Sequence, residues 1–288
     1  MYILNNRYKI CDLLNSGGFG KIYNGIDLLN DNKIAIKIEE KQKYLQNESD
    51  VYDKIKGIKN MAIKYDFINT NNKSYLIMPL YYNSSDRFIK INSKYFNEKD
   101  ILMLGIQILQ QLNNLHKCEV IHNDIKPDNF IFDKNTNKFK LIDFGLSKVY
   151  IINDKHINFS KKCSRYGTLR YMTINAHKRY SLSRRDDLIS LSYSLIYLFY
   201  RTLPWKGIVD KNISKKKIHI SLIEKKSQYN KDILRNNIIS PILSLFNYSS
   251  KLSFDKKPDY NYLIKGFYNY LKFKNYKYDG RWSWSKDI

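Results

Sequence analysis

Cysteine is scarce in this chain and follows no pattern. The three cysteines, at positions 11, 118 and 163, are far apart and odd in number. They exclude a disulfide framework and a cysteine-based metal site, and they fit a reducing compartment. Residues 1–8 also lack the apolar core of a signal peptide. We therefore expect a protein that works in the cytoplasm.

Long hydrophobic runs are missing as well. The longest apolar-rich run, residues 188–200, contains three serines and stops at Arg201, which is too short to cross a bilayer. It reads as a buried helix, so we expect no association with a membrane. The 288 residues, 43% of them hydrophobic, show no repeat and no low-complexity linker. This favours a single domain over residues 1–288 and a monomer.

Acidic residues are few beside the basic ones. The chain has 27 Asp and Glu against 50 Lys and Arg, a net charge of +23. Such a charge attracts acidic peptides, phosphorylated surfaces or nucleic acid. However, the lysines are spread along the whole chain, and a composition heavy in Asn, Ile, Lys and Tyr is equally typical of a genome rich in A and T. Charge alone names no partner, and nucleic acid stays a candidate.

What the chain does contain is one stretch, residues 121–145, with two polar clusters. H-N-D-I-K-P-D-N and D-F-G each lie beside an apolar run, and the turn formers D-K-N-T-N-K separate the two runs. This pattern predicts a hairpin that carries Asp124, Asn129 and Asp143 at the ends of its strands. Their oxygens suit Mg²⁺, which takes few protein ligands and shares the rest with phosphates and water.

The stretch resembles the catalytic region of protein kinases. In that family an Asp accepts the proton of the substrate hydroxyl, while an Asn five residues later and the D-F-G Asp hold metal. The resemblance assigns catalysis to Asp124 and Lys126, with Lys126 neutralising the γ-phosphate, and metal binding to Asn129 and Asp143. It implies ATP and Mg²⁺ as cofactors, with Mn²⁺ as a substitute. Asn123 replaces the arginine of H-R-D, so we expect an activation segment that needs no phosphorylation to become ordered.

Residues 7–40 read as three strands, with the glycine-rich turn L-N-S-G-G-F-G-K-I-Y between the first two. Glycines at this place let backbone N–H groups approach the phosphates of a nucleotide. Asn15 stands where the G-x-G-x-x-G motif has its first glycine, and asparagine tolerates left-handed backbone. The resemblance implies that this turn and its flanking strands bind ATP through Asn15, Ser16, Gly17, Gly18, Phe19, Gly20, Ile22 and Ala35.

Lys37, in K-I-A-I-K-I, matches the kinase V-A-I-K signature, whose lysine binds the α- and β-phosphates. Its partner should be a glutamate on a nearby helix. Apolar residues recur at helical spacing over residues 44–55, which contain Glu48. We choose Glu48, because Glu39 and Glu40 lie too close in sequence to turn back.

Residues 74–79 predict the strand that leads into the hinge between two lobes. Met78 would then lie behind the adenine of ATP, while the Pro79 carbonyl and the Tyr81 N–H would face the base. Helices are expected after Asn97, a candidate cap, and over residues 188–200. The predicted fold is therefore α+β: a bilobal kinase fold with a β-rich N-terminal lobe (1–80) carrying one main helix, and a mainly α C-terminal lobe (81–288).

The later motifs resemble the casein kinase 1 superfamily, which has S-I-N in place of A-P-E, followed by S-R-R-D-D-L and L-P-W. Here T-I-N, S-L-S-R-R-D-D-L and L-P-W fall within residues 173–205, and G-G-F-G-K-I-Y resembles the vaccinia-related kinase branch. The resemblance implies a serine/threonine kinase in which Thr168 bridges Asp124 and Lys126, and Asp187 holds the backbone of the catalytic loop. The short chain and its composition suit a virus or a reduced parasite, and hence the host cytoplasm.

Members of that superfamily favour acidic or already phosphorylated protein substrates. Six basic residues flank the activation segment and could bind carboxylate or phosphate, although solvated lysines are equally expected in so basic a protein: Lys161, Lys162, Arg165, Arg170, Lys178 and Arg179. The alternative function is a nucleotide-binding pseudokinase that acts as a scaffold, suggested by Asn15 and Asn123. We favour the active enzyme, because the lysine, the catalytic aspartate and both metal ligands are all present.

Overall fold

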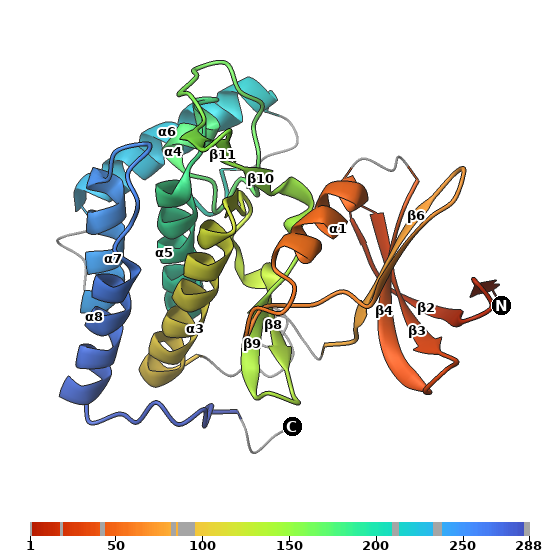
Figure 1. The fold of residues 1–288 in the computed structure, drawn as a ribbon. Coiled ribbons are helices and arrows are strands. Elements are labelled where there is room, and N and C mark those ends of the chain that lie inside the picture. Colours follow the sequence, from red (N-terminus) through yellow and green to blue (C-terminus); the bar gives the residue numbers. More distant parts are fainter. Residues whose placement is uncertain are drawn as a thin grey trace.

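The computed structural model describes residues 2–17, 20–40, 44–81, 85, 96–208, 213–232 and 238–284. It has two lobes, as the sequence predicted: a β-sheet with one helix beside it, and a larger lobe made mainly of helices (Figure 1). In the described part, no helix has both the length and the apolar character needed to cross a membrane.

The N-terminal lobe is a six-stranded antiparallel sheet with the order β1-β2-β3-β4-β6-β5. Its elements are β1 (Tyr2–Leu4), β2 (Tyr8–Gly17), β3 (Gly20–Asp27), β4 (Asn32–Glu39), α1 (Tyr44–Lys54), β5 (Asp66–Asn69) and β6 (Ser74–Pro79). Ile34 and Ile36 on β4 are fully buried and pack with Tyr75 and Ile77 of β6. Alternate residues of the strands thus form the core of this lobe.

The glycine-rich turn departs from the sequence prediction at Asn15. This residue lies in β2 opposite Ile22, and it is not among the residues with positive φ. The left-handed conformation that asparagine tolerates is therefore not used, because the strand pairing reaches to Gly17 and Gly20 and keeps Asn15 extended. Gly20 has a φ of 115°, and a Cβ there would lie 2.3 Å from the Ile38 carbonyl oxygen, so only glycine fits. The predicted ATP-binding residues Gly18 and Phe19 lie outside the described residues.

The C-terminal lobe is built around two buried helices. Its helices are α3 (Glu98–Lys117), α4 (Ile174–His177), α5 (Arg184–Tyr200), α6 (Lys215–Asp232), α7 (Ser240–Lys251) and α8 (Tyr260–Phe273). The predicted cap is confirmed, since Asn97 and Asp100 form a reciprocal capping box at the start of α3. Helix α5 begins earlier than its apolar run, because the Asp186 carboxylate accepts from the Ser183 N–H at 3.0 Å and so stabilises a polar first turn.

Short elements of this lobe carry the functional loops. They are β7 (Val120–Ile121), η1 (Pro127–Asn129), β8 (Phe130–Asp133), β9 (Lys138–Leu141), η2 (Phe144–Leu146), β10 (Lys148–Val149), β11 (Ile151–Ile152) and β12 (Lys155–His156). The predicted hairpin is confirmed, with Phe130 paired to Leu141. Beyond this pair the Ile142 N–H donates to the Asn129 carbonyl at 3.1 Å. The hairpin therefore brings Asn129 next to the residue that precedes Asp143.

Candidate active site

Lys37 joins the two lobes through a pair of carboxylates. Its Nζ lies 2.7 Å from Oε2 of Glu48 and 2.7 Å from Oδ1 of Asp143. The expected partner, Glu48 of α1, is therefore the one found. Burial opposes the charge on Lys37, but the attraction of Asp143 and Glu48 outweighs it and raises the pKa of the lysine above its ordinary value. The lysine is held as an ammonium between two anions.

The two carboxylates respond differently to this contact. Burial raises the pKa of Glu48 against the pull of Lys37, since its side chain is only 2% exposed. Burial acts in the same direction on Asp143, but Lys37 outweighs it and lowers the pKa of that carboxyl. Asp143 is also 24% exposed, so water helps to keep it ionised. It is the more accessible anion of the two.

Local contacts hold in place the elements that carry Lys37, Glu48 and Asp143, which we call the triad. Glu39, at the end of β4, accepts hydrogen bonds from the backbone N–H groups of Tyr44 and Leu45, and so binds the first turn of α1. Asp143 has left-handed backbone with a φ of 67°, and the next residue, Phe144, is fully buried against Tyr52 of α1. The buried ring and the turned backbone direct the Asp143 carboxylate to Lys37.

On the opposite side, Asp124 lies in a hydrogen-bonded loop. Its Oδ1 accepts from the backbone N–H of Thr168 at 2.8 Å and from the Thr168 hydroxyl at 2.9 Å. Its Oδ2 accepts from Lys126 Nζ at 2.7 Å, and the same ammonium lies 3.1 Å from Thr168 Oγ1. The predicted bridge from Thr168 to Asp124 and Lys126 is therefore present. Attraction to Asp124 raises the pKa of Lys126 in spite of burial.

Asp187 holds the backbone of this loop from α5. Its carboxylate accepts from the N–H groups of His122, at 2.7 Å, and Asn123, at 2.9 Å, and contacts Nε2 of His116 at 2.9 Å. Asp187 is only 2% exposed, so these contacts satisfy donors that have no access to water. These contacts agree with the role that the resemblance implies for Asp187, which stays a prediction.

The residues proposed to bind metal have the right chemistry for Mg²⁺. The Asn129 amide nitrogen donates to the Asp124 carbonyl at 2.9 Å, which leaves its side-chain oxygen as an acceptor, while its backbone carbonyl is bound to the residue that precedes Asp143. Among the described residues, no three His, Cys, Asp or Glu side chains are grouped to hold a metal. An amide and a carboxylate therefore fit an ion that takes its remaining ligands from phosphates and water.

Comparison with known families agrees with this geometry. The family model described as "Protein kinase domain" matches residues 8–264, which is most of the chain. The chain belongs to the protein kinase family. Membership implies a phosphotransferase that acts on protein substrates, with ATP and typically a divalent metal as cofactors.

The other described residues that the sequence predicts to bind ATP lie on β2, β3, β4 and β6 and just after β6. They are Ser16 and Gly17 in β2, Gly20 and Ile22 in β3, Ala35 in β4, Met78 and Pro79 at the end of β6, and Tyr81 just after it. Ala35 pairs with Met78 and Ile34 with Pro79, while the Tyr52 hydroxyl lies 3.4 Å from the Met78 sulfur. The strand pairing therefore places Ala35 beside the end of β6, and the contact of all these residues with ATP stays a prediction.

The motif analysis missed a buried network beneath the loop that follows Thr168. Lys226 of α6 is fully buried and donates to the carbonyls of Leu169 (2.9 Å) and Met172 (2.6 Å), and its Nζ lies 2.9 Å from Nε2 of His177. Burial lowers the pKa of Lys226 well below its ordinary value, and the other ring nitrogen of His177, Nδ1, lies 2.8 Å from Nδ1 of His219. Burial, reinforced by Lys226, lowers the pKa of His177 to about 2.

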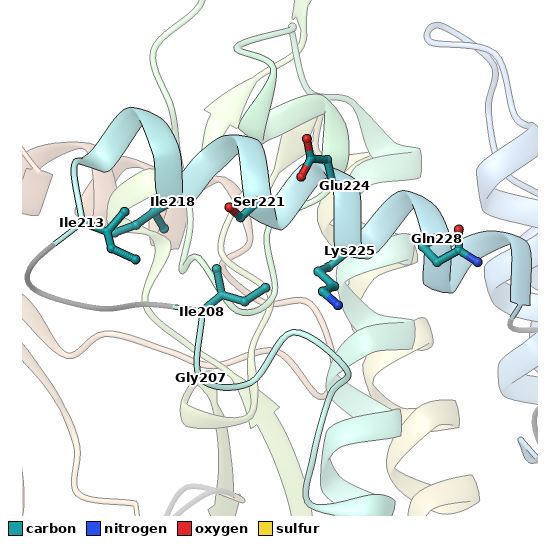
Figure 2. A pocket seen from close by; sticks show the side chains of 8 residues that line it. All are labelled: Gly207, Ile208, Ile213, Ile218, Ser221, Glu224, Lys225 and Gln228. Carbon is teal, nitrogen blue, oxygen red and sulfur yellow. The ribbon is translucent and has the colours of Figure 1, made fainter.

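A surface hollow of about 620 Å³ lies elsewhere in the kinase, between α6 and the segment at Gly207 and Ile208. Figure 2 shows Ile208, Ile213 and Ile218 at one end of it and the polar side chains of α6 along its length. None of the predicted site residues lines this hollow. It is separate from the Lys37–Asp124 region and contributes nothing to the chemistry described above.

Proposed function

We propose that this kinase transfers the γ-phosphate of Mg·ATP to serine or threonine residues and is of the casein kinase 1 type. The observation that carries the proposal is the contact of Thr168 with both Asp124 and Lys126. This threonine fixes the two charged groups next to the place where a substrate hydroxyl would enter. Serine/threonine kinases of the family that the motifs resemble have a threonine in this position.

Each group has a role that follows from its position. Asp124 accepts the hydroxyl proton and orients the oxygen, while Lys126 neutralises charge on the γ-phosphate. Lys37 binds the α- and β-phosphates and is held in place by Glu48. Asn129 and Asp143 are the residues that would hold Mg²⁺, which when bound neutralises the phosphates.

The preferred substrates are acidic or already phosphorylated proteins. No acidic residue occurs between Asp154 and Asp186, a stretch with nine Lys and Arg residues. The six basic residues that flank the activation segment, Lys161 to Arg179, are all exposed. Because no carboxylate in this stretch competes for these cations, they are suited to bind carboxylate or phosphate on a substrate.

The test is transfer of labelled γ-phosphate to casein, followed by identification of the phosphorylated amino acid. Wild type should label serine and threonine, and Asp124→Asn, which keeps the size of the side chain, should lose nearly all transfer. Labelling of tyrosine alone would contradict the serine/threonine assignment. If wild type and variant are equally silent with Mg²⁺ and Mn²⁺ while ATP still raises the melting temperature, the protein is a nucleotide-binding scaffold.

A second experiment tests the substrate preference. A serine peptide with acidic neighbours should have a KM well below that of the same peptide with neutral neighbours, and rising salt should narrow the difference. Equal KM values would contradict the preference. Because the same charges could attract nucleic acid, competition by DNA and RNA should be measured in parallel.

A further inference from the structure

Two asparagine side chains hold the backbone that follows Asp143. The Asn47 Nδ2 of α1 lies 3.2 Å from the Phe144 carbonyl oxygen, 3.3 Å from that of Gly145 and 3.0 Å from that of Ser147. The carbonyl between them, that of Leu146, accepts from Nδ2 of Asn123 at 2.9 Å. Four consecutive carbonyls thus face amide nitrogens from two different parts of the kinase.

The chemistry of the partners fixes how Asn47 is oriented. All three neighbours are carbonyl oxygens, so only the NH₂ end of the amide can face them. Its two hydrogens are shared among three acceptors, as happens where backbone carbonyls crowd at a short helical turn. An oxygen in its place would meet three acceptors and bind none of them.

Asn47 and Asn123 each lie next to a residue of the candidate active site. Asn47 directly precedes Glu48, so α1 contacts Lys37 through one residue and the backbone beyond Asp143 through its neighbour. Asn123 directly precedes Asp124, and its own N–H is bound to Asp187. The segment 144–147 is therefore held by α1 on one side and by the catalytic loop on the other.

We propose that Asn47 and Asn123 are positioning residues that keep the segment 144–147 against α1, and so keep Asp143 and Glu48 together at Lys37. The amides need neither a charge nor a phosphate group to do this. The expected effect on kinetics rests on the proposed function. The expected effect on the position of the segment 144–147 rests on the contacts alone.

Asn47→Leu, which keeps the size of the side chain but removes both donors, should lower kcat/KM for ATP about tenfold with little change in the KM of the peptide. Asn47→Asp places a carboxylate against three carbonyls and should lower it at least as much. Asn123→Asp tolerates the φ of 67° at this position but places a carboxylate against the Leu146 carbonyl, so kcat/KM should fall here too, by less than at Asn47 because one carbonyl is faced instead of three. The matched control is Gln46→Leu, because the Gln46 amide contacts Asp50 and Asn69 but not the segment.

Because both amides hold one segment, the effect of the double variant Asn47→Leu/Asn123→Asp on kcat/KM should be smaller than the product of the single effects. Independent effects that multiply would overturn the idea of a shared segment. A variant at Asn47 that behaves like Gln46→Leu, or that raises the KM for ATP and for the peptide equally, would overturn the positioning role.

Hydrogen exchange of the full-length kinase without nucleotide gives a readout that needs no activity. Asn47→Leu should speed exchange in α1 and in residues 144–147, while α5 and the β8–β9 hairpin keep the wild-type rates. Uniformly faster exchange would indicate general destabilisation and overturn the proposal. If wild type transfers no phosphate, the proposed function fails, yet the exchange comparison still decides whether the two amides hold the segment.

Discussion

The charged groups around Lys37 and those around Asp124 are positioned by different means. Around Lys37, which we call the N-terminal side, Glu48 and Asp143 come from α1 and from the loop after β9 of the other lobe, and they meet Lys37 of β4 through side chains alone. On the C-terminal side, Asp124 is fixed by a backbone N–H of Thr168, and the loop before it by Asp187. The first side depends on where α1 lies, whereas the second is assembled within one lobe.

This comparison indicates which side of the site is more easily altered by a change in the position of α1. A shift of α1 separates Glu48 from Lys37 directly, whereas it reaches the catalytic loop through the segment 144–147, which Asn47 and Asn123 both hold. We therefore expect changes on the N-terminal side to be rescued by a second change at a partner. Changes on the C-terminal side should be harder to rescue, since backbone groups lose their acceptors.

The largest effect is expected from Lys37→Met, which leaves Glu48 and Asp143 without their cation. Breaking a buried ion pair costs about 3–5 kcal/mol of unfolding free energy. With the cation gone, the folded-state pKa of Glu48 lies further above its unfolded value, so the missing stability is greatest above the folded pKa and is recovered as the pH falls toward the unfolded pKa. Urea denaturation between pH 8 and pH 5 should show the deficit narrow.

Glu48→Gln in the Lys37→Met background is the matched second change. It removes the more buried of the two uncompensated carboxylates, while Asp143 keeps its access to water, and should restore most of the lost free energy of unfolding without restoring ATP binding. A deficit that stays the same in the double variant, at every pH, would mean that the triad is not what stabilises this side.

Asp187→Asn is expected to have the next largest effect. The amide keeps the size of the side chain but presents an NH₂ where backbone donors need an acceptor, which should cost about 2–3 kcal/mol. Denaturant unfolding measures the loss, and kcat should fall with it because the loop before Asp124 is released. If a single nearby substitution restored the stability of Asp187→Asn, the two sides would not differ in how easily they are rescued.

A variant at His177 tests whether the structure beneath the loop after Thr168 is as firmly held as the C-terminal side. The folded-state pKa of His177 is about 2, well below the ordinary 6.5. The neutral histidine therefore makes its full contribution to the free energy of unfolding above pH 6.5, and this contribution is lost as the pH falls. At pH 5 the loss is about 2 kcal/mol relative to pH 7. His177→Gln can still accept from Lys226 and should flatten this part of the stability profile. Parallel profiles for wild type and variant would contradict the buried neutral histidine.

The smallest effect should come from Asp53→Asn. Asp53 contacts Lys64 at 2.7 Å, but its side chain is 60% exposed. Exposed ion pairs of this kind contribute about 0–1 kcal/mol. Both the melting temperature and the kinase activity should therefore stay near the wild-type values, and a loss as large as that of Lys37→Met would show that exposure is not what separates the two classes of contact.

Much of the catalytic side could be predicted from the sequence because its partners are close in the chain or fixed by a hairpin. Asp124, Lys126 and Asn129 fall within six residues, and the turn formers after Asp133 set the register that places Asn129 beside Asp143. Glu48 could be chosen because it lies in the helically spaced segment 44–55, whereas Glu39 and Glu40 are too close in sequence to Lys37 to turn back. The assignment to the casein kinase 1 superfamily and to a viral or parasitic source stays a prediction.

The sequence by itself thus determined the lobes, the hairpin and the charged residues that meet at the cleft, since each is written in a local pattern of polarity or in a motif. Only the tertiary structure decided the contacts of Asn47, Asn123 and Lys226. Their partners are backbone carbonyls 23 to 100 residues away, and for Lys226 also a histidine. Asparagine and lysine are the commonplace residues of this chain, and a backbone carbonyl is present at every position. The physical reason is that packing decides which backbone carbonyl comes within hydrogen-bonding distance of these side chains. The types of the residues involved do not reveal that choice.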